Sequence, residues 1–335
     1  MSIQKGFGAI ALLIVILSCK GDPLDIDSAN VKVNIAYYNM DSIFVHSTPE
    51  ELVNWNKRFK AEINDAYLYE LGVGLRLEND DDSTILVNIA NFASDTFMLK
   101  FEKRIQEKFP NLAEKHQNIA LGFRNLKYHF PKMKMPRSII FANTVFQSSA
   151  FATQDDLMIG VERYLGHDDD LIQSLPSQYY YEWIKEGFEE KYMERDALAN
   201  WLMTHLVDMQ EGNLAENMIN WGKILYYTEA SFPDKSDDII IRYSPEDLKW
   251  ANENEASFWQ YLKKEKMLFK TDQDESINIL APGPFTAGLP EKGPDRLGQF
   301  LGWKIVRSYM EENEITLEQL FKTKYNKILT AYEID

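Results

Sequence analysis

The feature that most constrains the fold is a long succession of helical patterns in the second half of the chain. From about residue 176 onward, apolar residues recur at three- and four-residue spacing, which is typical of amphipathic helices packed on a core. The patterned runs lie near residues 177–193, 196–210, 213–229, 245–264, 295–311 and 316–332. No internal repeat divides this region, so the sequence predicts a continuous helical body.

The first half of the chain mixes helices with a few strands. Strand-like alternation or β-branched and aromatic enrichment marks three stretches, residues 31–37, 138–146 and 157–163. Thr48, Pro49 and Glu50 supply an N-cap, a proline at the first helical position and an acidic first turn, which predicts a helix starting there. Two further helices are expected, near residues 95–108 and 111–128.

Together these patterns predict an α+β fold that is mainly helical, with a small sheet in the N-terminal half. A boundary near residues 171–176 would divide the chain, but the acidic stretch 168–170 is a poor linker, so we expect a single domain over residues 31–335. Residues 281–298 are rich in proline and glycine. Because proline lacks the amide donor that a phosphate loop needs, we expect a stiff loop ahead of the next helix.

The N-terminus has the pattern of a bacterial lipoprotein signal. One lysine precedes an uncharged run over residues 7–17, and Ser18-Cys19 follows. A helix of this length rises roughly 16 Å, about half the hydrocarbon thickness of a bilayer, so cleavage is expected instead of a membrane span. We predict a signal peptide over residues 1–18, a tether over residues 19–30 and lipidation of Cys19. The alternative is a cytosolic protein whose apolar N-terminal helix buries the thiol.

Lipidation of Cys19 places the chain in the cell envelope. Each CH₂ group of a buried acyl chain contributes about 0.8 kcal/mol, so two or more chains hold a protein stably at a membrane. We therefore expect a lipid-anchored protein that is exported across the inner membrane and faces the periplasm. The sequence leaves open which membrane carries the anchor.

Composition and motifs exclude several classes of function. Cys19 is the single cysteine, which excludes intramolecular disulfides and cysteine-based metal sites. The 52 acidic residues exceed the 36 basic ones by 16, so nucleic acid is not an expected partner. The five histidines lie too far apart in sequence for two to share one helix turn, and the nucleophile elbow, Walker loop and EF-hand motifs are missing.

Two further groups of residues have a functional and a structural interpretation. The acidic runs 80–82 and 168–170 offer oxygen ligands for Ca²⁺, but their spacing favours solvated turns. Tyr179, Tyr180, Tyr181 and Trp183 are able to form a sugar-binding platform, although an aromatic core or interface is the favoured interpretation.

An extended motif lies near the C-terminus. It consists of FTAGL at residues 285–289, GPDRLG at 293–298 and LGWKIVRSYM at 301–310. Together with LMIGVERYLG at 157–166 and the lipoprotein signal, this motif resembles the GldB-type gliding motility-associated lipoproteins of Bacteroidetes. The resemblance covers the whole chain and implies a non-catalytic envelope protein that is required for gliding. Its partners would be other proteins of the motility and type IX secretion machinery.

That family in turn resembles the gluzincin-type metalloproteases, whose active-site helix carries His-Glu-x-x-His. The resemblance implies a degenerate zincin-like domain in which His205 takes the first ligand position, Leu206 the general-base position and Met209 the second ligand position. Trp221 would replace the downstream glutamate. Leucine, methionine and tryptophan cannot provide the N or O ligands and the base that zinc hydrolysis needs. We therefore expect a pseudo-metalloprotease with no metal, no cofactor and no catalytic residue.

Two other functions remain as alternatives. The chain could be a degenerate or differently equipped metallopeptidase-like hydrolase that uses Glu186, Glu189 or Glu190, and Glu186 and Glu190 are expected to share a helix face. It could also be a glycan-binding lipoprotein, which its aromatic content permits. A peptidase assay and sugar-dependent quenching of tryptophan fluorescence would distinguish these alternatives.

Overall fold

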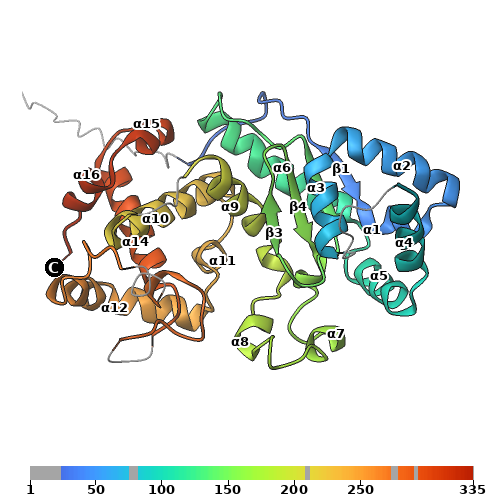
Figure 1. Ribbon diagram of the computed structural model, residues 1–335. Helices are drawn as coiled ribbons and strands as arrows, with labels where there is room; N and C mark the ends of the chain where they lie inside the picture. Colours follow the sequence, from blue (N-terminus) through green and yellow to red (C-terminus); the bar gives the residue numbers. More distant parts are fainter. Residues whose placement is uncertain (1–23, 75–81, 208–211, 273–277, 290–292, 335) are drawn as a thin grey trace, which may run out of the picture.

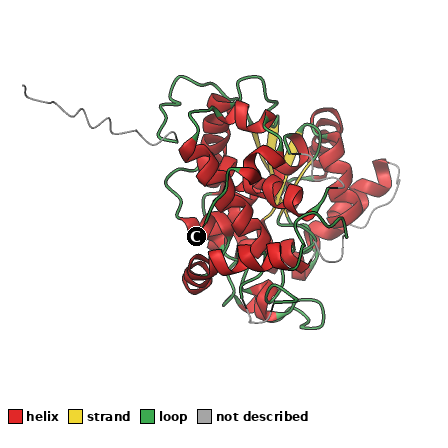
Figure 2. Ribbon diagram, turned by 90° about the vertical axis from the view of Figure 1, so that its left-hand side faces the viewer, coloured by secondary structure: helices red, strands yellow, loops and turns green. Residues whose placement is uncertain are grey.

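The computed structural model describes residues 24–74, 82–207, 212–272, 278–289 and 293–334. A small sheet lies inside a mainly helical body, as the sequence predicts. Figure 1 shows the first helices, in blue, on one side of the sheet, and the later helices, from green to red, on its other side and beyond. In the view of Figure 2 helices surround the strands.

The sheet has four short strands in the order β1-β2-β4-β3. The strands are β1 (Ala36–Asn39), β2 (Ser138–Ala142), β3 (Ala150–Ala152) and β4 (Asp156–Gly160). The strands β1, β2 and β4 run parallel, with Ala36 beside Ser138 and Ser138 beside Asp156, whereas β3 is an antiparallel edge strand on β4. The carboxyl ends of the three parallel strands therefore meet at one edge of the sheet.

Both faces of the sheet are buried, because alternate side chains point into two different cores. Ile139, Phe141 and Leu157 belong to the large core, whereas Ile140 and Met158 belong to a smaller one. This arrangement explains why β2 and β4 are apolar after their first residues, Ser138 and Asp156, and do not alternate with polar residues.

The smaller core is built with the first helices of the chain. The helical elements before β2 are α1 (Met40–His46), α2 (Pro49–Glu62), α3 (Asn64–Tyr69), the π-helical turn η1 (Glu70–Gly74), α4 (Asp82–Ser94), α5 (Thr96–Lys108) and α6 (Leu112–His129). The predicted start of α2 is confirmed by a capping box, in which Thr48 Oγ1 accepts from the Glu51 amide and the Glu51 carboxylate accepts from the Thr48 amide.

The large core joins the sheet to the later helices. The helical elements after the sheet are η2 (Val161–Tyr164), α7 (Asp170–Gln173), α8 (Glu182–Lys185), η3 (Glu190–Tyr192), α9 (Met193–His205), α10 (Leu214–Ser231), α11 (Asp237–Ile241), α12 (Pro245–Lys264), α14 (Leu297–Glu312), α15 (Leu317–Lys322) and α16 (Tyr325–Thr330). Helix α9 packs against β3, β4 and α6, and thereby connects the sheet to α10. Fully buried Trp201 and Phe123 meet edge-to-face between α9 and α6, at 5.8 Å between ring centroids.

Helices α10 and α14 touch backbone to backbone, which two glycines make possible. A Cβ atom on Gly302 would lie 1.9 Å from the Met218 carbonyl oxygen, and one on Gly222 would lie 2.2 Å from the Gly302 carbonyl oxygen. Both distances are far below van der Waals contact. Each position therefore needs glycine for this close approach, and not for an unusual backbone angle.

Several predicted elements are shorter in the structure than in the sequence pattern. The strand expected over residues 31–37 begins only at Ala36, because its neighbour β2 cannot extend backward through Pro136, which has no amide to donate. The helix expected near residues 177–193 was wrong, since only α8 and η3 form there and Gly187 lies between them. The run 316–332 forms two helices, α15 and α16, instead of one.

The predicted tether packs on the body in the part that the structure describes. Leu24 is buried in the large core, and the buried Ser28 hydroxyl donates to Asn125 Oδ1 at 2.5 Å. The described residues from Leu24 onward thus include part of the folded body before its expected start at residue 31. In the described part of the chain, no helix has both the length and the apolar character that a bilayer crossing requires.

Candidate functional site: a buried polar centre at the carboxyl edge of the sheet

Polar side chains follow each parallel strand at the edge where the strands end. Asp41 comes two residues after β1, Asn143 and Thr144 come directly after β2, and Glu162 comes two residues after β4. All four side chains are buried. In open parallel sheets, ligands bind outside the carboxyl ends of the strands, so this edge is the first place to search for a site.

Glu162 accepts two hydrogen bonds at this edge. Its Oε1 accepts hydrogen bonds from Thr144 Oγ1 at 2.6 Å and from the Phe146 amide at 2.8 Å. Its Oε2 has no hydrogen-bond partner within the described residues. Burial raises the pKa of Glu162 to about 7, because desolvation outweighs the hydrogen bonds that favour the charged form.

The backbone beside Glu162 is strained. Val145 and Phe146 have φ angles of 50° and 60°, which non-glycine residues adopt rarely and a β-branched valine especially so. Asn143 Oδ1 accepts from the Val145 amide at 2.9 Å and supports this turn. Gly160 allows it to pack tightly, since a Cβ atom there would lie 2.1 Å from the Ser148 carbonyl oxygen. Such strain often marks a functional site.

Three further carboxyl groups from different elements complete what we name the carboxyl cluster, defined as Asp41, Glu70, Glu102 and Glu162. Asp41 lies in the first turn of α1, Glu70 begins the π-turn η1 and Glu102 lies in α5, and all three side chains are buried. Burial raises the pKa of each carboxyl group, and the charges of its neighbours in the cluster raise the pKa values of Asp41 and Glu70 further. Within the described residues no ion pair neutralises any member.

A second buried centre lies at the start of α9, around Asp196. Asp196 accepts hydrogen bonds from Arg195 at 3.1 Å, from Arg242 at 3.0 Å and from the Tyr164 hydroxyl at 3.1 Å. Arg195 also donates to the Ile240 carbonyl at 2.7 Å, and burial lowers its pKa to about 10. This network of Asp196 and its donors joins the sheet, α9 and the chain around α11, which is a structural role.

The short helix η2 connects the two centres through three consecutive side chains. Glu162 belongs to the carboxyl cluster, and Tyr164 belongs to the Asp196 network. Arg163 between them lies over the Phe188 ring at 4.7 Å, and its Nε has no partner in the part of the chain that is described. Burial lowers the pKa of Arg163. The single turn of η2 therefore links the carboxyl cluster to the Asp196 network through neighbouring titratable side chains.

Among the described residues, no three His, Cys, Asp or Glu side chains stand close enough together to bind a metal ion. Burial raises the pKa of each carboxyl group of the cluster, which favours its protonated form.

The side chains predicted from the zincin resemblance lie elsewhere, at the far end of α9. His205 is the last residue of α9, stacks on Trp201 at 3.8 Å between ring centroids, and has Nε2 2.9 Å from the Thr153 carbonyl oxygen. A nitrogen that donates to a carbonyl carries a proton and cannot also bind a metal. Leu206 caps this helix, and Trp221 lies in α10 on the large core.

Two predicted site residues lie outside the described residues, namely Met209 and the lipidation site Cys19. Their assignments stay predictions. The acidic run 80–82 cannot be placed for the same reason, apart from the assignment of Asp82 as the first residue of α4.

The carboxylates proposed for a hydrolase do not form one group. Glu186 is exposed and caps α8, whereas Glu190 begins η3 and pairs with Lys115 at 2.7 Å, so the expected shared helix face was wrong. Gly187 interrupts the helix between them. Glu189 accepts from the His167 amide at 3.0 Å. These contacts give Glu189 and Glu190 structural roles.

The remaining candidates from the sequence also have structural partners. Asp169 caps α7 by accepting from the Leu171 amide and pairs with Arg104 at 2.6 Å, as a turn residue does. Tyr180 packs edge-on against Phe146, while Tyr179 and Tyr181 are exposed. No continuous aromatic platform of all three tyrosines therefore forms.

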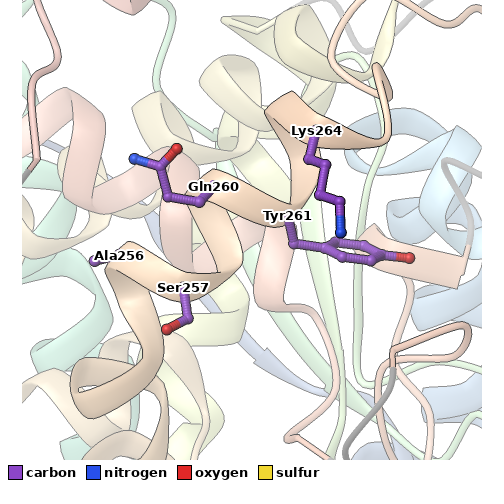
Figure 3. Close-up of a pocket in the computed structure, with 5 residues that line it drawn as sticks. All are labelled: Ala256, Ser257, Gln260, Tyr261 and Lys264. Atoms are coloured by element: carbon purple, nitrogen blue, oxygen red, sulfur yellow. The ribbon is translucent and has the colours of Figure 1, made fainter.

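Two hollows on the described surface lie away from the carboxyl cluster. One of about 560 Å³ is lined only by residues of α12, so it is a shallow helix face (Figure 3). The Tyr261 hydroxyl donates to the Gly288 carbonyl at 3.1 Å. Another of about 530 Å³ lies between α12 and the loop that carries Pro284 and Phe285.

The proline- and glycine-rich loop packs ahead of α14, as predicted. In its described part, the Thr286 hydroxyl donates to the Pro294 carbonyl at 2.6 Å, and Asp295 accepts from the Gly283 amide at 3.0 Å. Arg296 donates to the Ile241 and Arg242 carbonyls at 3.0 and 2.9 Å. The C-terminal motif thus reaches the same region of the chain as the Asp196 network.

The fold and these buried centres define a mainly helical α+β body with titratable groups in its interior. Over residues 21–333 the chain matches the family described as gliding motility protein GldB. The chain therefore belongs to this family, which its designation marks as a family of lipoproteins, and the resemblance of the C-terminal motif is confirmed. No curated protein and no solved structure matches the chain.

Proposed function

We propose that this chain is a lipid-anchored, non-catalytic component of the cell-envelope machinery for gliding, and that it acts by contacts with other motility and type IX secretion proteins. The observation that carries the proposal is the family match, which spans residues 21–333 and so includes nearly the whole body. An anchor at Cys19 would keep the body within a short distance of a membrane and raise its effective concentration toward membrane partners.

The non-catalytic part of the proposal is supported by the chemistry of the residues at the zincin-like positions. His205 has its Nε2 engaged with the Thr153 carbonyl, and Leu206 and Trp221 offer no ligand or base. We further propose that the body is a degenerate zincin-like scaffold. Its edge strand β3 and helix α9, which pack together, would correspond to the sheet edge and helix of such a site.

Gene deletion tests the role in gliding. A deletion strain should not spread on a surface and should display less adhesin, and the wild-type gene should restore both. A Cys19→Ala gene should produce folded protein that restores neither, because the body would not stay at the membrane. A deletion strain that glides normally would overturn the proposal.

Metal analysis and a peptidase assay test the absence of catalysis. Purified protein without its signal should contain no stoichiometric zinc, should keep its melting temperature in EDTA, and should not cleave a mixed peptide library with or without added zinc. Cleavage that a chelator abolishes would instead support the hydrolase alternative.

A further inference from the structure

We propose that the carboxyl cluster is a proton-binding site that seals the first helices of the chain onto the carboxyl edge of the sheet and loosens them when it is deprotonated. The seal joins α1, η1 and α5 to the ends of β2 and β4. It does not depend on the role in gliding.

Hydrogen bonds at the end of β2 bring two members of the cluster together. The carboxyl group of Asp41 accepts from the Asn143 amide, and the next residue, Thr144, donates through Oγ1 to Glu162 at 2.6 Å. Asp41 and Glu162 are thus held by adjacent residues, although they lie far apart in sequence. Asp41 therefore links α1 to the end of β2, and Thr144 links Glu162 to the same turn.

Glu70 points into the same interior with neither carboxyl oxygen hydrogen-bonded among the described residues. Its side chain is fully buried, and the charges of Asp41 and Glu162 both act on it. The preceding residue, Tyr69, stacks on Phe151 of β3 at 3.8 Å, which fixes the position of η1 against the sheet. π-helical turns such as η1 occur frequently at functional sites.

The groups that face the cluster from the packed elements supply little positive charge. From α5, Gln106 donates to Glu102 at 3.0 Å and lies 3.1 Å from His46 Nε2 of α1. From η2, Arg163 is turned onto Phe188. The other titratable neighbours are the tyrosines Tyr37 and Tyr69, whose pKa values are raised by burial and by these carboxyl charges. Ionising the cluster therefore places like charges together without a matching set of cations.

The sign of the pH dependence follows from the direction of the pKa shifts. A carboxyl group with a raised pKa in the folded state stabilises the closed form fully below its ordinary pKa, and this stabilisation is lost as the pH rises through the folded pKa. For Glu162 the window runs from its ordinary value of 4.5 to about 7. The closed form, in which the first helices pack on the sheet, should loosen over this range. The ionisation of Asp41 and Glu70, whose pKa values are also raised, acts in the same direction.

The loosening is measurable as local opening. For Glu162 alone, these two pKa values imply that the opening constant rises about 70-fold between pH 5 and pH 8, if the open form restores the ordinary pKa. Backbone hydrogen exchange of the full chain, corrected for the intrinsic pH dependence of exchange, would report this constant for α1, η1 and the turn after β2.

Glutamine at position 162 supplies the matched neutral variant. Glu162→Gln keeps the acceptor for Thr144 and Phe146 but cannot ionise. Between pH 5 and pH 8, the rise in its opening constant should therefore be about 70-fold smaller than the rise in the wild type. Asp41→Asn should lose part of the rise independently. Glu311→Gln, at an exposed position of α14, is the control and should follow the wild type.

Three results would overturn the proposal. They are a pH-independent opening constant in the wild type, an unchanged rise in Glu162→Gln, and a rise that is equal in every helix of the body. If Glu162→Gln does not fold, the wild-type profile and Asp41→Asn decide the question in the same way.

Discussion

The contact between α10 and α14 makes a sharp prediction for Gly302→Ala. The new methyl carbon would start 1.9 Å from the Met218 carbonyl oxygen and 2.6 Å from its carbonyl carbon. Cβ atoms essentially never approach a heavy atom closer than 3.0 Å, so the two helices must part by at least about 1.1 Å. Both partners are helix backbone, and no flexible side chain can move aside instead.

The cost follows from what this interface buries. A gap of about 1 Å forfeits roughly a quarter to a half of each dispersion contact across it. Met218, Ile219, Leu301 and Ile305 are all fully buried around the contact. Overpacking costs about 1–3 kcal/mol and sometimes more, while alanine regains about 1 kcal/mol of helix propensity over glycine. Because rigid backbone meets rigid backbone, we expect a net loss of about 3 kcal/mol.

Chemical denaturation would measure this loss as a lower midpoint, and the melting temperature should fall by about 4–5 °C, given an unfolding entropy of about 2.1 cal/mol/K per residue. Gly283→Ala is the matched control, since a Cβ atom there meets nothing closer than the Phe285 carbonyl oxygen at 3.4 Å, an ordinary van der Waals contact. Gly222→Ala should cost a similar amount, and the double variant should lose less than the sum, because one methyl already separates the helices. An unchanged midpoint for Gly302→Ala, or full additivity in the double variant, would refute the reasoning.

Further predictions concern the buried ion pairs and the anchor. Asp196→Asn leaves Arg195 and Arg242 without their carboxylate, so unfolding free energy should fall by about 3–5 kcal/mol; equal midpoints for variant and wild type in urea would contradict this. Arg307→Met removes a guanidinium that binds Glu229 at 2.8 Å, pairs with Asp237 and lies over the Trp303 ring at 3.8 Å. We expect a loss of about 3 kcal/mol in thermal or urea unfolding, against a change within about 0.5 kcal/mol for the exposed Lys322→Met. Metabolic labelling with palmitate should mark the wild-type chain and not Cys19→Ala, and persistent labelling of the variant would exclude this cysteine as the acceptor.

The elements that sequence analysis predicted well carry strong local signals. Helix α2 has an N-cap, a proline at its first position and an acidic turn, and the structure shows the capping box formed. Helix α12 likewise begins at Ser244 with proline at its first position. Long periodic runs such as 213–229 also gave correct helices, since their apolar faces are large enough to require burial.

The elements that were missed or misjudged are decided by tertiary contacts. Helix α1 is only seven residues long and follows β1 directly, so its apolar pattern is too short to distinguish from a strand continuation. Residues 177–193 do have helical spacing, but the chain needs a turn at Gly187, whose carbonyl accepts from Arg242 at 2.5 Å. The local sequence around Gly187 cannot predict a hydrogen bond to Arg242, because that residue lies far away along the chain.

The carboxyl cluster could not be assembled from the sequence either. Its members occur between residues 41 and 162 and resemble ordinary surface acids, because burial is a property of the assembled fold. One signal was present, namely a carboxylate two residues after each of two strands, at Asp41 and Glu162. Without knowing that the strands are parallel neighbours of β2, this spacing has no meaning.

The residues of the C-terminal motif and those of the carboxyl cluster have different roles in the fold. The residues of the C-terminal motif contact other parts of the fold. Gly302 lies against the Met218 backbone, and Arg307 donates hydrogen bonds to Glu229 and Asp237. Replacing them should act on stability before it acts on function. The groups at the carboxyl edge of the sheet differ, because Glu70 has unpartnered oxygens among the described residues and the backbone after Asn143 is strained. Backbone strain and unpartnered buried groups reduce stability and often occur at functional sites. Substitutions that impair gliding without lowering stability should therefore be sought first in the carboxyl cluster.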